Sequence, residues 1–183
     1  MVEMIDIDVL RNEVDSAIAS VEYNPNDRDT NVRIVEDIRN AITQLADGVI
    51  PSAQHIAEVA VATNENIQIR DFLMGVQLEK NIDYVGAYVS LLGNTIKKDK
   101  VIPLATVYCG LLYQVGEKED AKEFLSNVLD ISPEYSLALL LQRVFTAGWE
   151  PSGFQRMAEE LHEKVVASIY ETQEATSDNS SSN

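Results

Sequence analysis

The stretch from Pro103 to Ala147 constrains the fold most, because its apolar residues recur at helical spacing in three short consecutive segments. The first segment opens at Pro103, which suits the first turn of a helix since the N–H that proline lacks is unpaired there anyway. Gly116 ends that segment, Pro133 opens the third, and Gly148 closes it. This punctuation predicts three antiparallel helices joined by short turns.

Small residues in this stretch are spaced as in a tetratricopeptide unit, a helix pair of about 34 residues that ends in a proline. With that proline set at Pro133, the close-packing sites fall near Ala105, Cys109 and Ala121, and Gly116 lies at the inter-helix turn. The expected tryptophan is absent, and one unit is visible rather than an array. We therefore expect tetratricopeptide-like packing, whose helices present grooves to partners and seldom carry chemistry.

The rest of the chain follows the same helical spacing, and no window alternates with the period of two that is typical of strands. We predict an all-α fold, an antiparallel helical bundle or a short α-solenoid of about nine helices. Helix starts outside the 103–147 stretch are expected at Asp29 or Thr30, at Ser52, at Asp83 and at Ser152.

The composition predicts that the chain is divided into three parts. Residues 1–23 form an acidic N-terminal helix, residues 29–172 a helical domain, and residues 173–183 a disordered tail with too little apolar content to fold alone. A flexible linker, Asn24 to Asp29, follows the first helix. That helix either packs on its own chain, swaps to another subunit or docks on a partner.

The charge is strongly acidic: 30 acidic against 14 basic residues give a net charge of −16. Direct binding to nucleic acid is disfavoured, because affinity for phosphates comes from Lys and Arg. The surface is then either an ordinary acidic surface that aids solubility or an imitation of nucleic-acid phosphates.

With one cysteine, no signal-peptide pattern and no apolar run near the ~20 residues of a membrane span, we expect a cytoplasmic protein without membrane contact.

A family resemblance covers roughly Asp37 to Arg156. It is carried by Ile69-Arg70-Asp71, then by the run from Tyr113 to Gly116, and then by the run from Pro133 to Ala138. These features resemble the C-terminal helical part of an actinobacterial family, number forty-one ninety-two among the domains of unknown function. Longer members carry an α/β half before this region, and a free-standing short form would suit a phage or mobile-element gene. The resemblance implies no activity.

Catalytic and metal-binding patterns are weak. Glu159 and His162 have the Glu-x-x-His spacing of di-iron bundles, but no second such pair exists, and a solvated helix face is the simpler interpretation. Cys109 is expected to be a buried structural thiol. No nucleophile elbow, phosphate-binding loop or dinucleotide fingerprint occurs. We expect no enzymatic activity, no cofactor and no metal.

Four aromatic residues are candidate partner-binding residues. Tyr84, Tyr88 and Tyr108 fall in adjacent helices and could line a recognition groove or pack in the core. Trp149 lies in a loop, where it could anchor a partner or cap the end of a helix pair.

Three functions remain open at this point. The first is a non-catalytic helical interaction module that binds a protein partner or self-associates. The second is an acidic inhibitor, encoded by a phage or mobile element, that mimics nucleic acid toward a host nucleic-acid-binding enzyme. The third is an enzyme with an unrecognised site, which would need a titratable group with a shifted pKa in a deep pocket.

Overall fold

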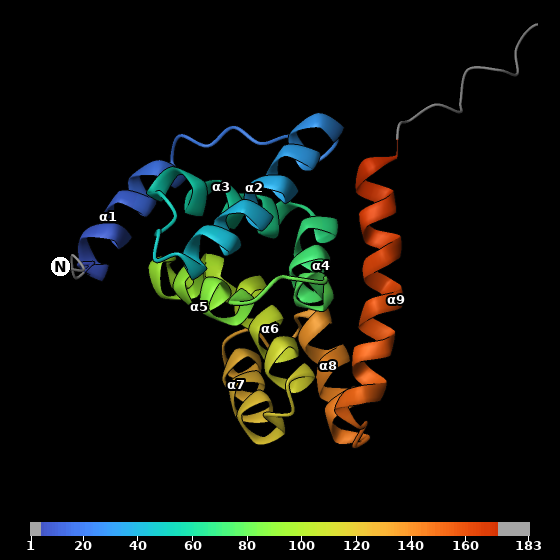
Figure 1. Cartoon of the computed structure of the whole chain (residues 1–183). Coiled ribbons are helices and arrows are strands. Elements are labelled where there is room, and N and C mark those ends of the chain that lie inside the picture. The colour runs from blue at the N-terminus through green and yellow to red at the C-terminus, as the bar shows by residue number, and fades with distance from the viewer. Residues whose placement is uncertain (1–4, 172–183) are drawn as a thin grey trace, which may run out of the picture.

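The computed structural model describes residues 5–171, which form nine α-helices and one short 3-10 helix, with no strand among them (Figure 1). The predicted all-α fold is confirmed. The α-helices are α1 (Ile7–Ile18), α2 (Arg28–Ala46), α3 (Ala53–Glu65), α4 (Ile67–Gly75), α5 (Val85–Thr95), α6 (Lys98–Gln114), α7 (Lys118–Ile131), α8 (Ser136–Thr146) and α9 (Pro151–Tyr170), and the 3-10 helix is η1 (Val76–Leu78).

Helix α6 is the centre of the molecule. It contacts α3, α4 and α5 on one side and α7 and α8 on the other, and α9 also packs against it. Its apolar residues occur on every face, and Leu104, Val107 and Leu111 are almost completely buried. A helix that is hydrophobic all round belongs in a core, which explains why six other helices surround this one.

Helix α9 is the longest helix, and Figure 1 shows it running along one whole side of the molecule. It packs on α4 and α6 and reaches α2. Its buried stripe consists of Phe154, Ala158, His162, Val165 and Ile169. Because α9 spans both the α1–α5 half and the α6–α8 half, it ties the two together.

The helix pair α6–α7 and the start of α8 correspond to the predicted close-packed unit. Cys109 and Ala121 are completely buried, and Gly116 has a φ of +91° at the turn, which favours glycine. Tetratricopeptide-like packing as such stays a prediction.

Several predicted helix starts are wrong by a few residues. Asp27, not Asp29 or Thr30, caps α2, because its carboxylate accepts the Asp29 and Thr30 N–H groups. Asp83 is not a cap, because Tyr84 stands at the N-cap of α5.

Two further starts also shift. Helix α9 begins at Pro151 after Glu150 instead of at Ser152. Pro103 lies inside α6, which begins at Lys98, and there it removes the single backbone bond that its N–H would have made. Ser52 caps α3 as predicted.

The N-terminal helix α1 packs on α3 and α5 of its own chain. Val14 is fully buried, Leu10 nearly so, and Arg11 donates two hydrogen bonds to the carbonyl of Asn94 at the end of α5. The predicted tail, residues 173–183, lies outside the described residues.

Candidate functional site: a groove between α5, α6 and α9

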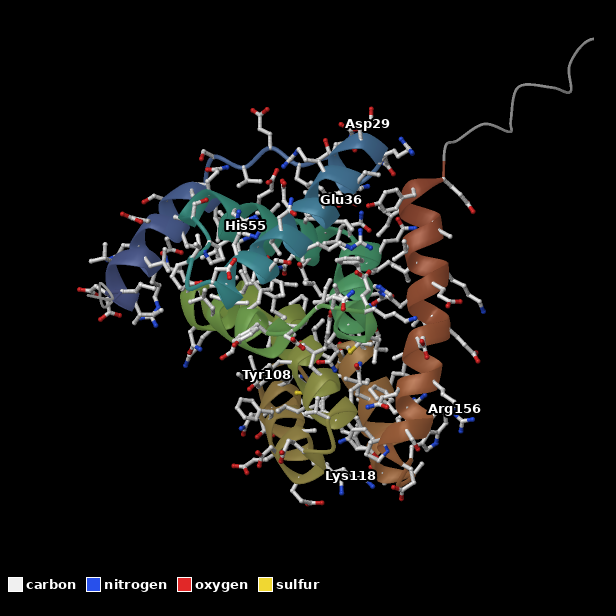
Figure 2. The ribbon with its side chains drawn as sticks, in the orientation of Figure 1. Asp29, Glu36, His55, Tyr108, Lys118 and Arg156 are labelled. Atoms are coloured by element: carbon white, nitrogen blue, oxygen red, sulfur yellow. The ribbon has the colours of Figure 1, made fainter. Side chains whose placement is uncertain are left out.

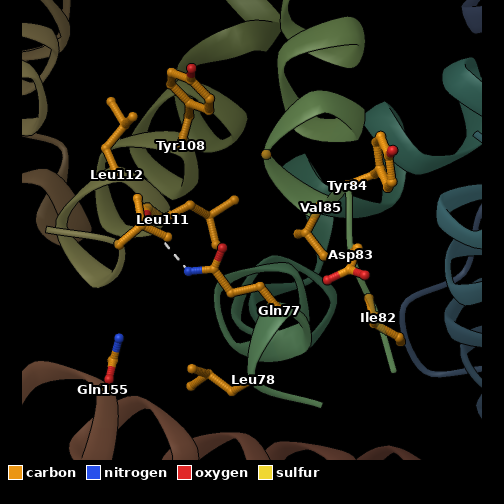
Figure 3. Close-up of a pocket in the computed structure, with 12 residues that line it drawn as sticks. Gln77, Leu78, Ile82, Asp83, Tyr84, Val85, Tyr108, Leu111, Leu112 and Gln155 are labelled. Carbon is orange, nitrogen blue, oxygen red and sulfur yellow. Dashed lines mark hydrogen bonds between the residues drawn. The ribbon is translucent and has the colours of Figure 1, made fainter. Parts of the chain in front are cut away.

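A groove of about 390 Å³ opens where η1, the start of α5, the middle of α6 and the start of α9 meet (Figure 3). Its lining is mixed, with six apolar and five polar residues besides Gly86. The apolar lining residues are Leu78, Ile82, Val85, Leu111, Leu112 and Val115, and the polar ones are Gln77, Asp83, Tyr84, Tyr108 and Gln155.

An unusual turn shapes one wall of this groove. Asn81 and Tyr84 both have left-handed backbone conformations, with φ values of +64° and +67°. Such conformations cost a non-glycine residue on the order of 1 kcal/mol or more. These two left-handed residues lie in the connection between η1 and α5, where the Tyr84 side chain is 54% exposed at the groove. Strain of this kind is typical of functional segments.

Three amide side chains form a hydrogen-bond network, in which Gln77 and Gln155 line the groove and Gln114 lies behind them. Gln114 Nε2 donates to the carbonyl of Met74 at 2.8 Å, so Gln114 Oε1 is free to accept from Gln77 Nε2 at 2.6 Å. Gln155 Nε2 donates to the carbonyl of Gln114 at 2.5 Å. Backbone carbonyls can only accept, and they therefore determine which end of each amide is the donor.

Aromatic and aliphatic side chains surround the mouth of the groove. The ring of Tyr108 meets that of Phe124 edge-on, with centroids 5.5 Å apart. Phe124 is 48% exposed and Val115 is 64% exposed. Exposed apolar side chains that gather around one hollow are typical of interaction sites.

The structure brings together two of the four candidate partner-binding residues. Tyr84 and Tyr108 both line the groove (Figure 3). Tyr88, one turn after Tyr84, is fully buried, and its hydroxyl pairs with His55 Nε2 at 2.7 Å. Burial raises the pKa of Tyr88 far above its ordinary value. It is therefore a core residue that a partner cannot reach.

Trp149 lies in the loop between α8 and α9 and is not among the residues that line the groove. Its side chain is 42% exposed, while its carbonyl accepts a hydrogen bond from Tyr113. Tyr113 is fully buried and stacks on Phe145, with ring centroids 4.1 Å apart. The loop that carries Trp149 is thus anchored to the core.

A second polar cluster, centred on Glu79, joins η1 to α2 and α9. Glu79 accepts from His162 Nε2 at 2.8 Å and from Arg39 at 2.7 and 2.9 Å. Arg39 also contacts Glu36 and Tyr170, and Figure 2 shows Glu36 on α2. Burial alone would raise the pKa of Glu79, but the hydrogen bonds from Arg39 and His162 lower it below its ordinary value.

The interpretation of Glu159 and His162 as part of a solvated helix face is wrong for His162, which is buried against Phe72 with ring centroids 5.3 Å apart. The helical spacing contains the signal that was missed, because His162 follows Phe154 and Ala158 at four-residue steps on the buried stripe. Glu79 could not be found in this way, because it follows the last residue of a short 3-10 turn.

Within residues 5–171 no group of three or more His, Cys, Asp and Glu side chains is placed to hold a metal ion. Cys109 is buried as predicted, and burial raises the pKa of its thiol to about 12. None of the helices in residues 5–171 is both long enough and apolar enough to span a membrane.

Comparison with known proteins places the chain in a family. No curated protein and no solved structure shows significant similarity to it. The sequence model of the family described as Domain of unknown function (DUF4192) matches residues 6–152, from α1 to the start of α9. This match confirms the resemblance. It begins in α1, whereas the resemblance seen in the sequence begins at about Asp37. Because the match covers most of the sequence, the chain belongs to the DUF4192 family.

Proposed function

We propose that this protein is a non-catalytic helical interaction module, cytoplasmic in setting, whose groove between α5, α6 and α9 receives a protein partner or a second copy of the chain. The observation that carries the proposal is the placement of Tyr84 and Tyr108 on opposite walls of one open groove with both apolar and polar lining residues. Tyrosine supplies large contact area and a polar hydroxyl at a low cost in side-chain entropy, which is why it is common in binding sites.

The groove is also held rigidly, which lowers the entropic cost of binding. The amides of Gln77, Gln114 and Gln155 are bonded to one another or to backbone carbonyls below it. The wall residue Leu111 is only 2% exposed. A site that is ordered before its partner arrives loses less freedom on binding.

Site-specific photocrosslinking tests this proposal. A benzophenone amino acid replaces Tyr108 in the full chain, which is expressed in an actinobacterial host, the setting that the family resemblance suggests. The matched control carries the same group at Ile67, which is 66% exposed at the other end of α4 from η1. We expect a specific crosslinked protein, or a crosslinked second copy, from position 108 only.

Two results would decide against the proposal or redirect it. The same crosslinks from both positions, or none from position 108, would contradict a role for the groove. A nucleic-acid-binding enzyme that is captured and then released by added salt would favour the alternative of an acidic inhibitor.

A further inference from the structure

We infer that the groove takes a cationic side chain, an arginine or lysine with apolar neighbours, from a segment of the partner protein. This inference rests on the proposed function and names the chemistry of the partner. Its basis is that the polar groups which the groove offers are acceptors, set between apolar and aromatic walls.

The first argument is the orientation of Gln77. Its Nε2 is occupied, because it donates to Gln114 Oε1 at 2.6 Å and lies 3.4 Å from the carbonyl of Leu111. Gln77 therefore presents its Oε1, an acceptor, as its remaining polar group. Asp83 adds a carboxylate, which Figure 3 shows on the side of the groove that carries Tyr84. Among the lining residues that the structure describes, no lysine, arginine or histidine neutralises these acceptors.

The second argument is the character of the walls. Tyr84 and Tyr108 line the groove, and a guanidinium or ammonium over an aromatic ring face gains about 0.5–1 kcal/mol even at an exposed site. Leu112 and Val115 offer apolar surface to the methylene stem of the same side chain. Arginine and lysine are the side chains that combine an apolar stem with a charged head.

The third argument is the charge of the whole molecule. The net charge is −16, and eight of the 14 basic side chains are already engaged in ion pairs with carboxylates. The surrounding field therefore attracts cations and repels acidic segments, and it acts before contact is made. Charge complementarity thus selects a basic partner segment over a neutral one or over a second copy of this acidic chain.

A matched pair of peptides tests the inference. The full-length protein, labelled with ¹⁵N, is titrated with N-acetyl-Leu-Arg-Leu amide and, separately, with N-acetyl-Leu-Gln-Leu amide, and amide chemical shifts are followed. We expect the arginine peptide to shift resonances of residues 82–86 and 108–112 and to bind at least about three-fold more tightly than the glutamine peptide. Asp83→Asn should weaken binding of the arginine peptide by about three-fold and leave the glutamine peptide unaffected.

Glu13→Gln on α1 is the control, because it removes the same charge from an exposed position on a helix that does not line the groove. It should leave both titrations unchanged. Equal binding of the two peptides, shifts confined to other surfaces, or no shifts at millimolar concentrations would each overturn the inference. A second copy crosslinked at position 108 would also overturn it. A different protein crosslinked there, combined with equal peptide binding, would refute the cation site and leave the interaction function standing.

Discussion

The imidazole of His162 lies directly against Gly75, so that a Cβ atom at Gly75 would stand 2.5 Å from Nδ1 of His162. The two residues bring α4 and α9 together at the point where η1 begins and the wall of the groove starts. His162 Nδ1 is buried and has no hydrogen-bond partner within residues 5–171, whereas Nε2 is bonded to Glu79. Because glycine has no side chain, the ring of His162 can lie this close to the backbone of α4 at position 75.

The first prediction is that Gly75→Ala destabilises the protein. Alanine normally favours a helix over glycine, but here the methyl group would overlap a buried ring, and overpacking costs about 1–3 kcal/mol. Urea unfolding followed by circular dichroism measures the change in the free energy of unfolding.

Gly153→Ala is the matched control for this experiment. A Cβ at Gly153, in the first turn of α9, meets no atom within 4 Å. It should stabilise the protein by about 0.4–1 kcal/mol through the lower entropy of the unfolded chain. If Gly75→Ala were as stable as the wild type, the packing of His162 against Gly75 would not be a tight contact.

The second prediction concerns Glu79 and low pH. Its pKa is lower in the folded protein than the ordinary value of 4.5, so its contribution to stability is fully present above that pH and is lost as pH falls through the folded pKa. Glu79→Gln should lower the free energy of unfolding at pH 7 by about 1–3 kcal/mol, because it leaves Arg39 half-buried without its carboxylate.

The measurement is urea unfolding from pH 7 down to pH 3, and the gap between wild type and Glu79→Gln should narrow below about pH 4.5. Glu36→Gln serves as the control, because Glu36 meets the same Arg39 from a half-exposed position and should cost less than about 1 kcal/mol. A gap that stays constant with pH would contradict the prediction.

The third prediction concerns His55 near neutral pH. Burial lowers the pKa of His55 below 6.5, although Asp37 and Glu58 oppose that shift. The unfolded chain then takes up a proton before the folded protein does, so stability is complete above about pH 6.5 and falls as pH is lowered below it. His55→Gln, whose amide can still form a hydrogen bond with the Tyr88 hydroxyl, should flatten the pH dependence of the unfolding free energy between pH 7 and pH 5.5.

Much of the fold could be predicted from sequence because helical spacing reports which face of each helix is buried. Cys109 and Ala121 are buried where the spacing of small residues placed them. The first and last residues of a helix are harder to predict, because several neighbouring polar residues can serve as the cap. At α2 it is Asp27 rather than Asp29 that accepts the free N–H groups.

The groove could not be predicted in the same way. The sequence identifies Tyr84 and Tyr108 only as separate candidates. They line one groove because the chain turns at Asn81 and Tyr84 in left-handed conformations, and although asparagine adopts this conformation more readily than most residues, tyrosine does not signal it. Likewise His162 meets Glu79 across 83 residues of sequence, a contact that no local pattern contains. Sequence therefore predicted the helices better than the loops that build the site.

The last prediction uses Trp149, the single tryptophan, as a probe of the α8–α9 loop. Tyr113→Phe removes the hydroxyl that donates to the carbonyl of Trp149 but keeps the ring stacked on Phe145. Loss of this buried bond should cost about 1 kcal/mol and increase quenching of Trp149 fluorescence by acrylamide. Tyr135→Phe, which removes a weaker bond at 3.3 Å from Arg70, is the control and should leave quenching unchanged. Equal quenching in both variants would show that the Tyr113 hydroxyl does not anchor this loop.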